Sequence, residues 1–142
     1  MLKPSLILLA LLFSANVSAE NWQDLGAAED GSVKQTIDAD SIKPYNDFFY
    51  EAWGMVNFST EQTEKEFKFR SIKMQQVFDC KGHRTAIPQH NVYSGANGTG
   101  NIVYQHKPAE NEELDMQDTS PDSPNGAALI FVCHYVNDHP SK

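Results

Sequence analysis

Five histidines are the side chains in this chain best suited to metal chemistry. They are His83, His90, His106, His134 and His139. No two of them have the His-x3-His spacing that places two imidazoles on one face of a helix, and both cysteines are expected to be engaged elsewhere. We therefore interpret the histidines as loop and surface residues and predict no metal site and no cofactor.

The serines and glycines form neither a hydrolase motif nor a phosphate-binding loop. Ser94-Gly95 lacks the Gly-x-Ser-x-Gly pattern of a nucleophile elbow. The glycine-rich run from Gly95 to Gly100 lacks the Lys-Ser/Thr pair of a phosphate loop and lies between two predicted strands. We predict that this run is a turn, that the chain has no catalytic residues, and that the protein is not an enzyme.

Cys80 and Cys133 are the only cysteines of the chain. An even number of cysteines in an exported protein predicts one disulfide, with two buried thiols as the alternative. A redox pair is disfavoured because such chemistry uses the Cys-x-x-Cys spacing. A bridge over this length of chain would stabilise the fold by roughly 4 kcal/mol.

Basic residues are concentrated in one stretch of an otherwise acidic chain. Six of the ten that follow residue 19 lie close together in sequence, namely Lys65, Lys68, Arg70, Lys73, Lys81 and Arg84. This cluster is either the solvated face of a strand or an electrostatic patch for an acidic partner. Further along, Glu110, Glu112, Glu113, Asp115, Asp118 and Asp122 indicate a solvated acidic loop, with a plug for a basic enzyme as the alternative.

The first 19 residues have the composition of a signal peptide. Lys3 provides the positive start, an apolar run extends from Leu6 to Phe13, and Val17-Ser18-Ala19 places small residues where signal peptidase reads them. We expect cleavage before Glu20 and one domain over residues 20–142. The apolar run is far shorter than the ~20 residues that a membrane-spanning helix needs, so we predict no membrane span.

The formal net charge of −8 excludes some classes of partner, and loss of the leader removes Lys3 as well. A general nucleic-acid binder needs a basic surface, so no nucleic-acid partner is expected. The aromatic content of 11% is sufficient for a packed core and argues against disorder.

Alternating apolar residues predict a mainly antiparallel sheet. We expect a short strand over residues 32–37, one helical turn over 38–42, a central strand over 48–58, a polar connection over 59–64 and a strand over 66–80. The apolar parity of the last strand changes near Arg70-Ser71, which predicts a β-bulge there. That bulge would place Lys68, Arg70 and Lys73 together on the solvated face.

The second half of the chain contains weaker strands and an ambiguous last element. We expect an edge strand over 85–93, because it contains Pro88, then a strand over 102–104 and a long loop over 107–126. Ser123-Pro124 is typical of a helix start, and Leu129, Val132 and Val136 have helical spacing. Residues 130–132 also suit a strand. We favour a helix and keep the strand as the alternative.

Several short motifs resemble the bacterial surface-adhesin protein E-like family. They are Trp22, the run from Val33 through Asp38 to Ile42, Trp53 in an aromatic strand, Phe78-Asp79-Cys80, and the prolines and serine of Pro121-Asp122-Ser123-Pro124 leading to Val132-Cys133. The resemblance implies an antiparallel sheet with a small helical component. It also implies a cell-envelope protein that binds host extracellular-matrix proteins.

The expected fold class is therefore α+β, mainly antiparallel sheet, with a C-terminal helix favoured and one disulfide. The expected function is non-catalytic binding of a host matrix protein or another envelope protein. No cysteine precedes Cys80, so lipid anchoring is not expected, and the periplasm, the cell surface or the medium are the candidate locations. The alternatives are a periplasmic lysozyme inhibitor and a small-ligand carrier. The sequence predicts no oligomeric state.

Overall fold

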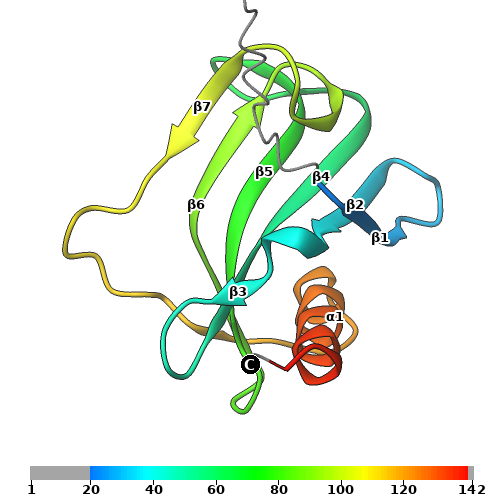
Figure 1. Cartoon of the computed structure of the whole chain (residues 1–142). Helices are drawn as coiled ribbons and strands as arrows, with labels where there is room; N and C mark the ends of the chain where they lie inside the picture. The colour runs from blue at the N-terminus through cyan, green and yellow to red at the C-terminus, as the bar shows by residue number, and fades with distance from the viewer. Residues whose placement is uncertain (1–19, 141–142) are drawn as a thin grey trace, which may run out of the picture.

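The computed structural model describes residues 20–140 (Figure 1). The predicted signal peptide, residues 1–19, lies outside the described residues. Antiparallel strands form one sheet in the order β1-β2-β4-β5-β6-β7, with β3 added to β4 and β8 added to β6. The strands are β1 (Trp22–Ala27), β2 (Val33–Asp38), β3 (Lys43–Pro44), β4 (Tyr50–Thr63), β5 (Lys68–Asp79), β6 (Arg84–Tyr93), β7 (Ile102–His106) and β8 (Gln117–Asp118).

A single α-helix, α1 (Pro124–Asp138), packs on one face of this sheet within the described residues. Ser123 caps it by accepting a hydrogen bond from the backbone N–H of Gly126 at 3.0 Å, and proline follows as the first helical residue. Leu129 and Val132 are buried against the sheet. The favoured helix is thus confirmed, because the apolar stripe finds a partner surface that a short strand there would not fill.

The core lies between α1 and the disulfide end of the sheet. Ile37, Ala52 and Phe78 come from three neighbouring strands and are buried beneath the helix. Full burial of a large apolar side chain such as that of Ile37 or Phe78 contributes about 1.5–3 kcal/mol to the free energy of unfolding. The predicted antiparallel α+β architecture is confirmed.

The predicted helical turn before Pro44 is also present, as η1 (Ala39–Ser41). The Asp38 carboxylate accepts from the backbone N–H of Asp40 at 3.1 Å and from that of Asn21 at 2.9 Å. The second bond fastens the start of β1, a strand that the sequence analysis did not predict.

The irregularity expected in the strand at Arg70-Ser71 lies in its neighbour instead. β5 runs without interruption, whereas β4 carries extra residues between Asn57 and Gln62. Arg70 faces this bulge and its guanidinium donates to the carbonyl oxygens of Phe58 (3.2 Å) and Ser59 (2.9 Å), two groups that the bulge removes from the β4–β5 ladder. The prediction of a bulge in this strand was therefore wrong, and so was the placement of its apolar residues on one core face, because uninterrupted alternation puts Phe69 and Phe78 on opposite faces. It was also wrong in placing Lys73 on the same face as Arg70, because uninterrupted alternation puts them on opposite faces.

β6 is not the edge strand that Pro88 predicted. It pairs with β5 on one side, and with β7 and β8 on the other. Pro88 lies where the β5–β6 register shifts, in the interval between the residues that pair with β8 and those that pair with β7. Its missing N–H therefore costs no ladder hydrogen bond.

A candidate partner-binding surface at the disulfide end of the sheet

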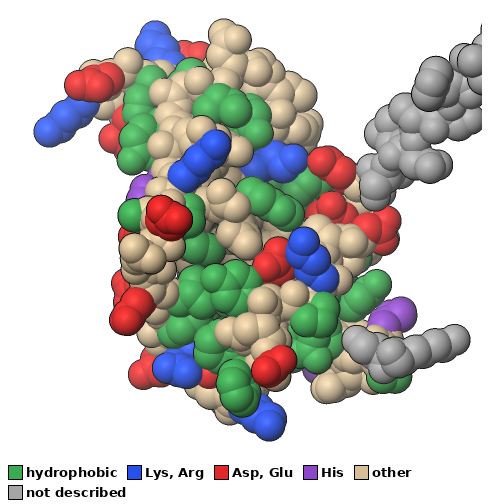
Figure 2. All heavy atoms as spheres, turned by 60° about the vertical axis from the view of Figure 1, so that its left-hand side comes forward, with side chains coloured by type: hydrophobic (Ala, Val, Ile, Leu, Met, Phe, Trp, Pro, Cys, Tyr) green, Lys and Arg blue, Asp and Glu red, His purple; other side chains and the backbone are tan. Residues whose placement is uncertain are grey.

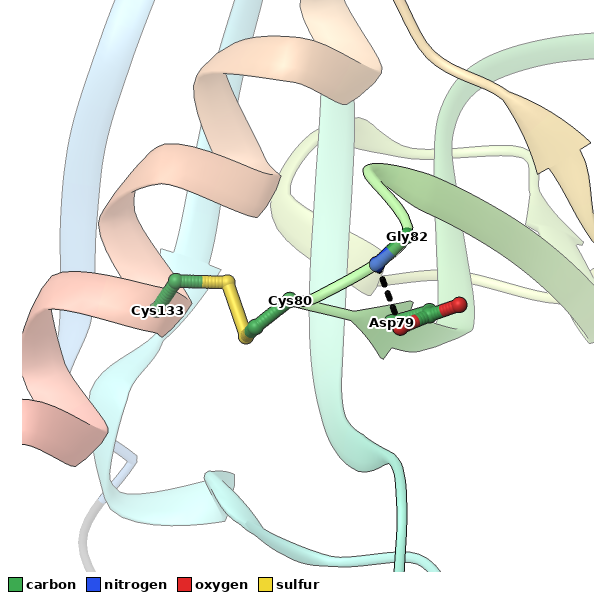
Figure 3. The surroundings of a disulfide bond; sticks show 4 residues. All are labelled: Asp79, Cys80, Gly82 and Cys133. Carbon is green, nitrogen blue, oxygen red and sulfur yellow. Dashed lines mark hydrogen bonds between the residues drawn. A yellow bond between two sulfur atoms is a disulfide. The ribbon is translucent and has the colours of Figure 1, made fainter.

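The predicted Cys80–Cys133 disulfide is confirmed and fixes one end of the sheet to the helix. Cys80 directly follows β5, Cys133 lies on α1, and their Cα atoms are 5.8 Å apart (Figure 3). The bridge joins the C-terminal end of β5 to a helix that is distant in sequence. Both segments border the surface described next.

The turn beyond the disulfide is held by a carboxylate and a guanidinium. Asp79 accepts from the backbone N–H of Gly82 at 2.8 Å and from two guanidinium nitrogens of Arg84 at 3.0 and 2.8 Å. Burial raises the pKa of Asp79, but the hydrogen bond from Gly82 and the charge of Arg84 together outweigh it and lower the pKa. A Cβ at position 82 would collide with this carboxylate, so a larger residue there would displace the Asp79 side chain from Arg84.

A second loop beside this turn presents an aromatic side chain to solvent. The Asn46 side-chain oxygen accepts from the backbone N–H groups of Phe48 and Phe49, at 2.8 and 2.7 Å. The backbone N–H of Tyr45 donates to the carbonyl of Phe49 at 2.9 Å. These bonds hold the loop closed, yet Phe48 is 78% exposed, the largest value among the exposed large hydrophobic side chains. The hydrogen bonds of the loop therefore hold the phenyl ring of Phe48 in an exposed position.

The two loops enclose a hollow of about 560 Å³. We call it, with its rim, the disulfide-end surface; it is lined by Asp47, Phe48, Phe49, Tyr50, Asp79, Cys80, Lys81, Arg84, Val136 and Asn137. Lys81 and Asp47 are both exposed on it and carry opposite charges. In Figure 2, hydrophobic side chains gather in the lower part of the molecule with charged side chains of both signs among them. Figure 1 shows the β5–β6 turn at that same lower end.

Only two of the six predicted patch residues, Lys81 and Arg84, reach the disulfide-end surface. Lys65 and Lys68 lie at the other end of β5, a strand of about 36 Å by its length. There Lys68 pairs with Glu61 at 3.8 Å.

The remaining two basic residues are engaged within the fold. Arg70 binds backbone carbonyls, and Lys73 pairs with Glu20 at 3.3 Å and lies over the ring of Trp22. Closeness in sequence therefore did not predict closeness in space. β5 spreads the basic residues along its length and places them on alternate faces of the sheet.

Two of the five histidines, expected to be loop and surface residues, are half-buried on strands. His90 on β6 and His106 on β7 are paired across the strands, with ring centroids 5.7 Å apart. Burial, and then the neighbouring His106, lower the pKa of His90. Across residues 20–140, no group of three or more His, Cys, Asp or Glu side chains is placed to hold a metal ion. Nor is any helix in that range long and apolar enough to cross a bilayer.

Sequence reasoning missed the Phe48 loop because it assigned Phe48 to the central strand by its parity. The signal that could have identified the loop is Pro44 followed by Asn46-Asp47, since these are turn-forming residues. The Asn46 side chain ends the alternation by hydrogen-bonding the backbone of the next two aromatic residues.

Comparison with known proteins gives one family and one fold. Residues 22–134 match the family described as surface-adhesin protein E. A structure of Haemophilus influenzae protein E is similar with a TM-score of 0.54 and 18% identity over 75% of this chain and 82% of that chain. Protein E from non-typeable Haemophilus influenzae is similar with a TM-score of 0.52 and 19% identity, over 84% and 88%. No curated protein matches the sequence.

Proposed function

Because the chain belongs to the surface-adhesin protein E family, we propose that it is an exported, non-catalytic binding protein of the bacterial cell envelope that attaches to host extracellular-matrix proteins. The disulfide-end surface is its binding site. Cleavage before Glu20 releases the mature chain to the periplasm, the cell surface or the medium. Intact-mass measurement of the exported protein tests this step, and an N-terminus elsewhere or an added acyl mass contradicts it.

The observation that carries the proposal is the closed loop that keeps Phe48 exposed. Aromatic side chains are enriched among the residues that dominate binding energy, especially where they fill a pocket on a partner. A rigid loop loses little conformational entropy on binding, so more of the burial energy appears as affinity. Full burial of a phenylalanine side chain is worth about 1.5–3 kcal/mol.

The charged rim orients the partner rather than setting the affinity. Lys81 is exposed and makes no ion pair within the described residues, whereas Arg84 is committed to Asp79. Attraction between exposed charges is screened beyond about 8 Å at physiological salt. Binding through Phe48 should therefore keep most of its strength as salt rises, while the association rate falls.

The test compares Phe48→Ala with the parent on immobilised vitronectin and laminin. We expect the variant to bind about tenfold or more weakly, since truncation of a central aromatic anchor commonly costs over 1.4 kcal/mol. The matched control is Ile102→Ala, which truncates a 51% exposed side chain on β7 and should bind as the parent does.

Two further binding measurements distinguish another site on the protein and another partner from this proposal. If the residues at the far end of β5 form the site, Lys65→Glu with Lys68→Glu will weaken binding and Phe48→Ala will not. If the parent binds neither matrix protein but binds lysozyme at low salt, the lysozyme-inhibitor function replaces the adhesin function.

A further inference from the structure

A second hollow, of about 460 Å³, lies on the sheet face turned away from α1. We call it the Trp22 hollow; it is lined by Glu20, Trp22, Asp24, Lys34, Thr36, Met55, Asn57 and Asn97. Thr36 pairs with Met55 across β2 and β4, and the next residue along β2, Ile37, is buried under the helix. Because side chains alternate along a strand, Thr36 and Met55 face away from α1. The hollow is therefore separate from the disulfide-end surface.

The floor and one wall of the Trp22 hollow are apolar. Met55 is 5% exposed at its base. The indole N–H of Trp22 already donates to the Glu20 carboxylate at 2.7 Å, so the indole contributes ring surface rather than an unpaired polar atom. Lys73 lies 5.5 Å from the ring centroid and 3.3 Å from the same carboxylate, which fixes the indole in place.

The rim is polar and its charges are balanced. Lys34 pairs with Asp24 at 3.2 Å, as Lys73 does with Glu20. The Thr36 hydroxyl makes no hydrogen bond to the rest of the described chain, and neither does the side-chain amide of Asn97. These groups can each donate and accept hydrogen bonds. A neutral ligand rich in hydroxyl groups matches this lining better than an anion or a cation does.

Asn97 is held over the hollow in a conformation that favours glycine. Its φ is 58°, and its backbone N–H donates to the Asn57 side chain at 2.6 Å. The buried Ser71 hydroxyl donates to the carbonyl of Gly95 and accepts from the N–H of Gly98, so the turn η2 (Ala96–Gly98) is fastened to the sheet. Asparagine tolerates the left-handed region, so the turn keeps the unpaired side-chain amide of Asn97 at the rim of the hollow.

We propose that the Trp22 hollow binds one neutral pyranose unit of a glycan. The ring face of the sugar packs on Trp22 and Met55, and its hydroxyl groups exchange hydrogen bonds with Thr36, Asn57 and Asn97. The volume lies within the ~300–1,000 Å³ of small-ligand sites, and an apolar base with a few convergent polar groups is their usual composition.

The test titrates the ¹⁵N-labelled exported protein with the methyl glycosides of glucose, galactose, mannose and N-acetylglucosamine. At least one sugar should give saturable amide shifts confined to β1, β2, the middle of β4 and η2. No saturable shift with any of them up to ~20 mM, or shifts centred elsewhere, overturns the proposal. The sugar that binds best is then offered in a mammalian N-glycan and in a soluble cell-wall fragment, which distinguishes a host source from a bacterial one.

Asn97→Gly is the diagnostic variant, because glycine adopts φ near 58° without strain and the fold should be kept. Loss of the amide should weaken sugar binding about fivefold, the worth of one typical hydrogen bond. Thr36→Val, which preserves side-chain shape, should weaken it similarly, and Asn111→Gly in the exposed acidic loop should not. Unchanged affinity in both Asn97→Gly and Thr36→Val overturns the proposal. Phe48→Ala should leave the sugar shifts intact, so this test and that of the proposed function fail independently.

Discussion

Removing the Cys80–Cys133 bridge should destabilise the fold more than any other change considered for this chain. The bridge closes a loop of 53 residues that contains β6, β7, β8 and part of α1. In the chain-entropy treatment, losing a loop constraint of this length lowers the free energy of unfolding by about 4 kcal/mol. Small domains have only ~5–15 kcal/mol in total, so the effect is a large part of the stability.

The suitable perturbation is Cys80→Ala with Cys133→Ala, which leaves no reactive thiol. With a urea m-value of about 1.5 kcal/mol/M, the unfolding midpoint should fall by close to 3 M. The parent measured in reductant is the control and should unfold at nearly the same midpoint as the double variant. The variant should also bind matrix proteins less well, because the β5–β6 turn is no longer fastened to α1.

The refuting result is a midpoint shift below about 0.5 M with an unchanged m-value. Alkylation of thiols in the unreduced parent would show that the two cysteines are not bonded and would contradict the prediction as well. Either outcome would mean that packing of α1 on Ile37, Ala52 and Phe78, without the covalent bond, sets the stability of this end of the sheet.

Three further changes test the local contacts, each by urea unfolding at defined pH. Asp79→Asn should lower the free energy of unfolding by about 1–3 kcal/mol at neutral pH by leaving the Arg84 guanidinium with a weaker acceptor. Because folding lowers the pKa of Asp79, its contribution to stability is complete above the ordinary value of 3.8 and is lost as pH falls below it. The parent should therefore lose more stability than the variant in that range, where the other carboxyl groups titrate in both proteins, and parallel pH profiles would contradict this. Gly126→Ala should destabilise the protein although alanine favours helices, because the added Cβ collides with the backbone of Ser120 and Pro121. A stabilised variant would show that α1 does not approach this backbone so closely. Arg70→Glu should cost about 1–3 kcal/mol through the carbonyls that it leaves unpaired, whereas Lys68→Glu should stay within ~0.5 kcal/mol; equal effects would contradict the assigned contacts.

Local signals in the sequence were sufficient for much of the fold. Ser123-Pro124 marks the start of α1, and Asp38 marks η1, because each side chain satisfies backbone donors within a few residues of itself. The Cys80–Cys133 pairing followed from an even cysteine count and the predicted export. Alternation identified β4 and β5, since both are long and have a buried face.

Features that depend on pairing between distant segments were not predictable in the same way. The apolar parity of β5 changes near Arg70 because its two ends bury opposite faces: Phe69 packs on Phe58, whereas Phe78 lies beneath α1. A parity change alone cannot distinguish this arrangement from a bulge, because which face is covered depends on distant segments. β1 was missed because its pairing shifts between Asp24 and Gly26, which interrupts the alternation.

The two candidate sites differ in how far sequence reasoning could reach them. The Phe48 loop has turn-forming residues before it, so composition held a usable signal. The Trp22 hollow joins β1, β2, β4 and η2, segments that become neighbours only through the sheet order. The basic cluster is the opposite case, because its residues are close in sequence but lie at opposite ends and on opposite faces of β5.

The central claim, that the disulfide-end surface binds a matrix protein, is tested most directly by hydrogen exchange of the complex. Amide exchange of the exported protein is compared with and without saturating vitronectin, or laminin if only that binds. New protection should be confined to the loop at residues 45–49, the turn at 80–83 and the last turn of α1. Protection at the β4–β5 hairpin around Lys65, or at the acidic loop over 107–116, with no change at 45–49 would contradict it.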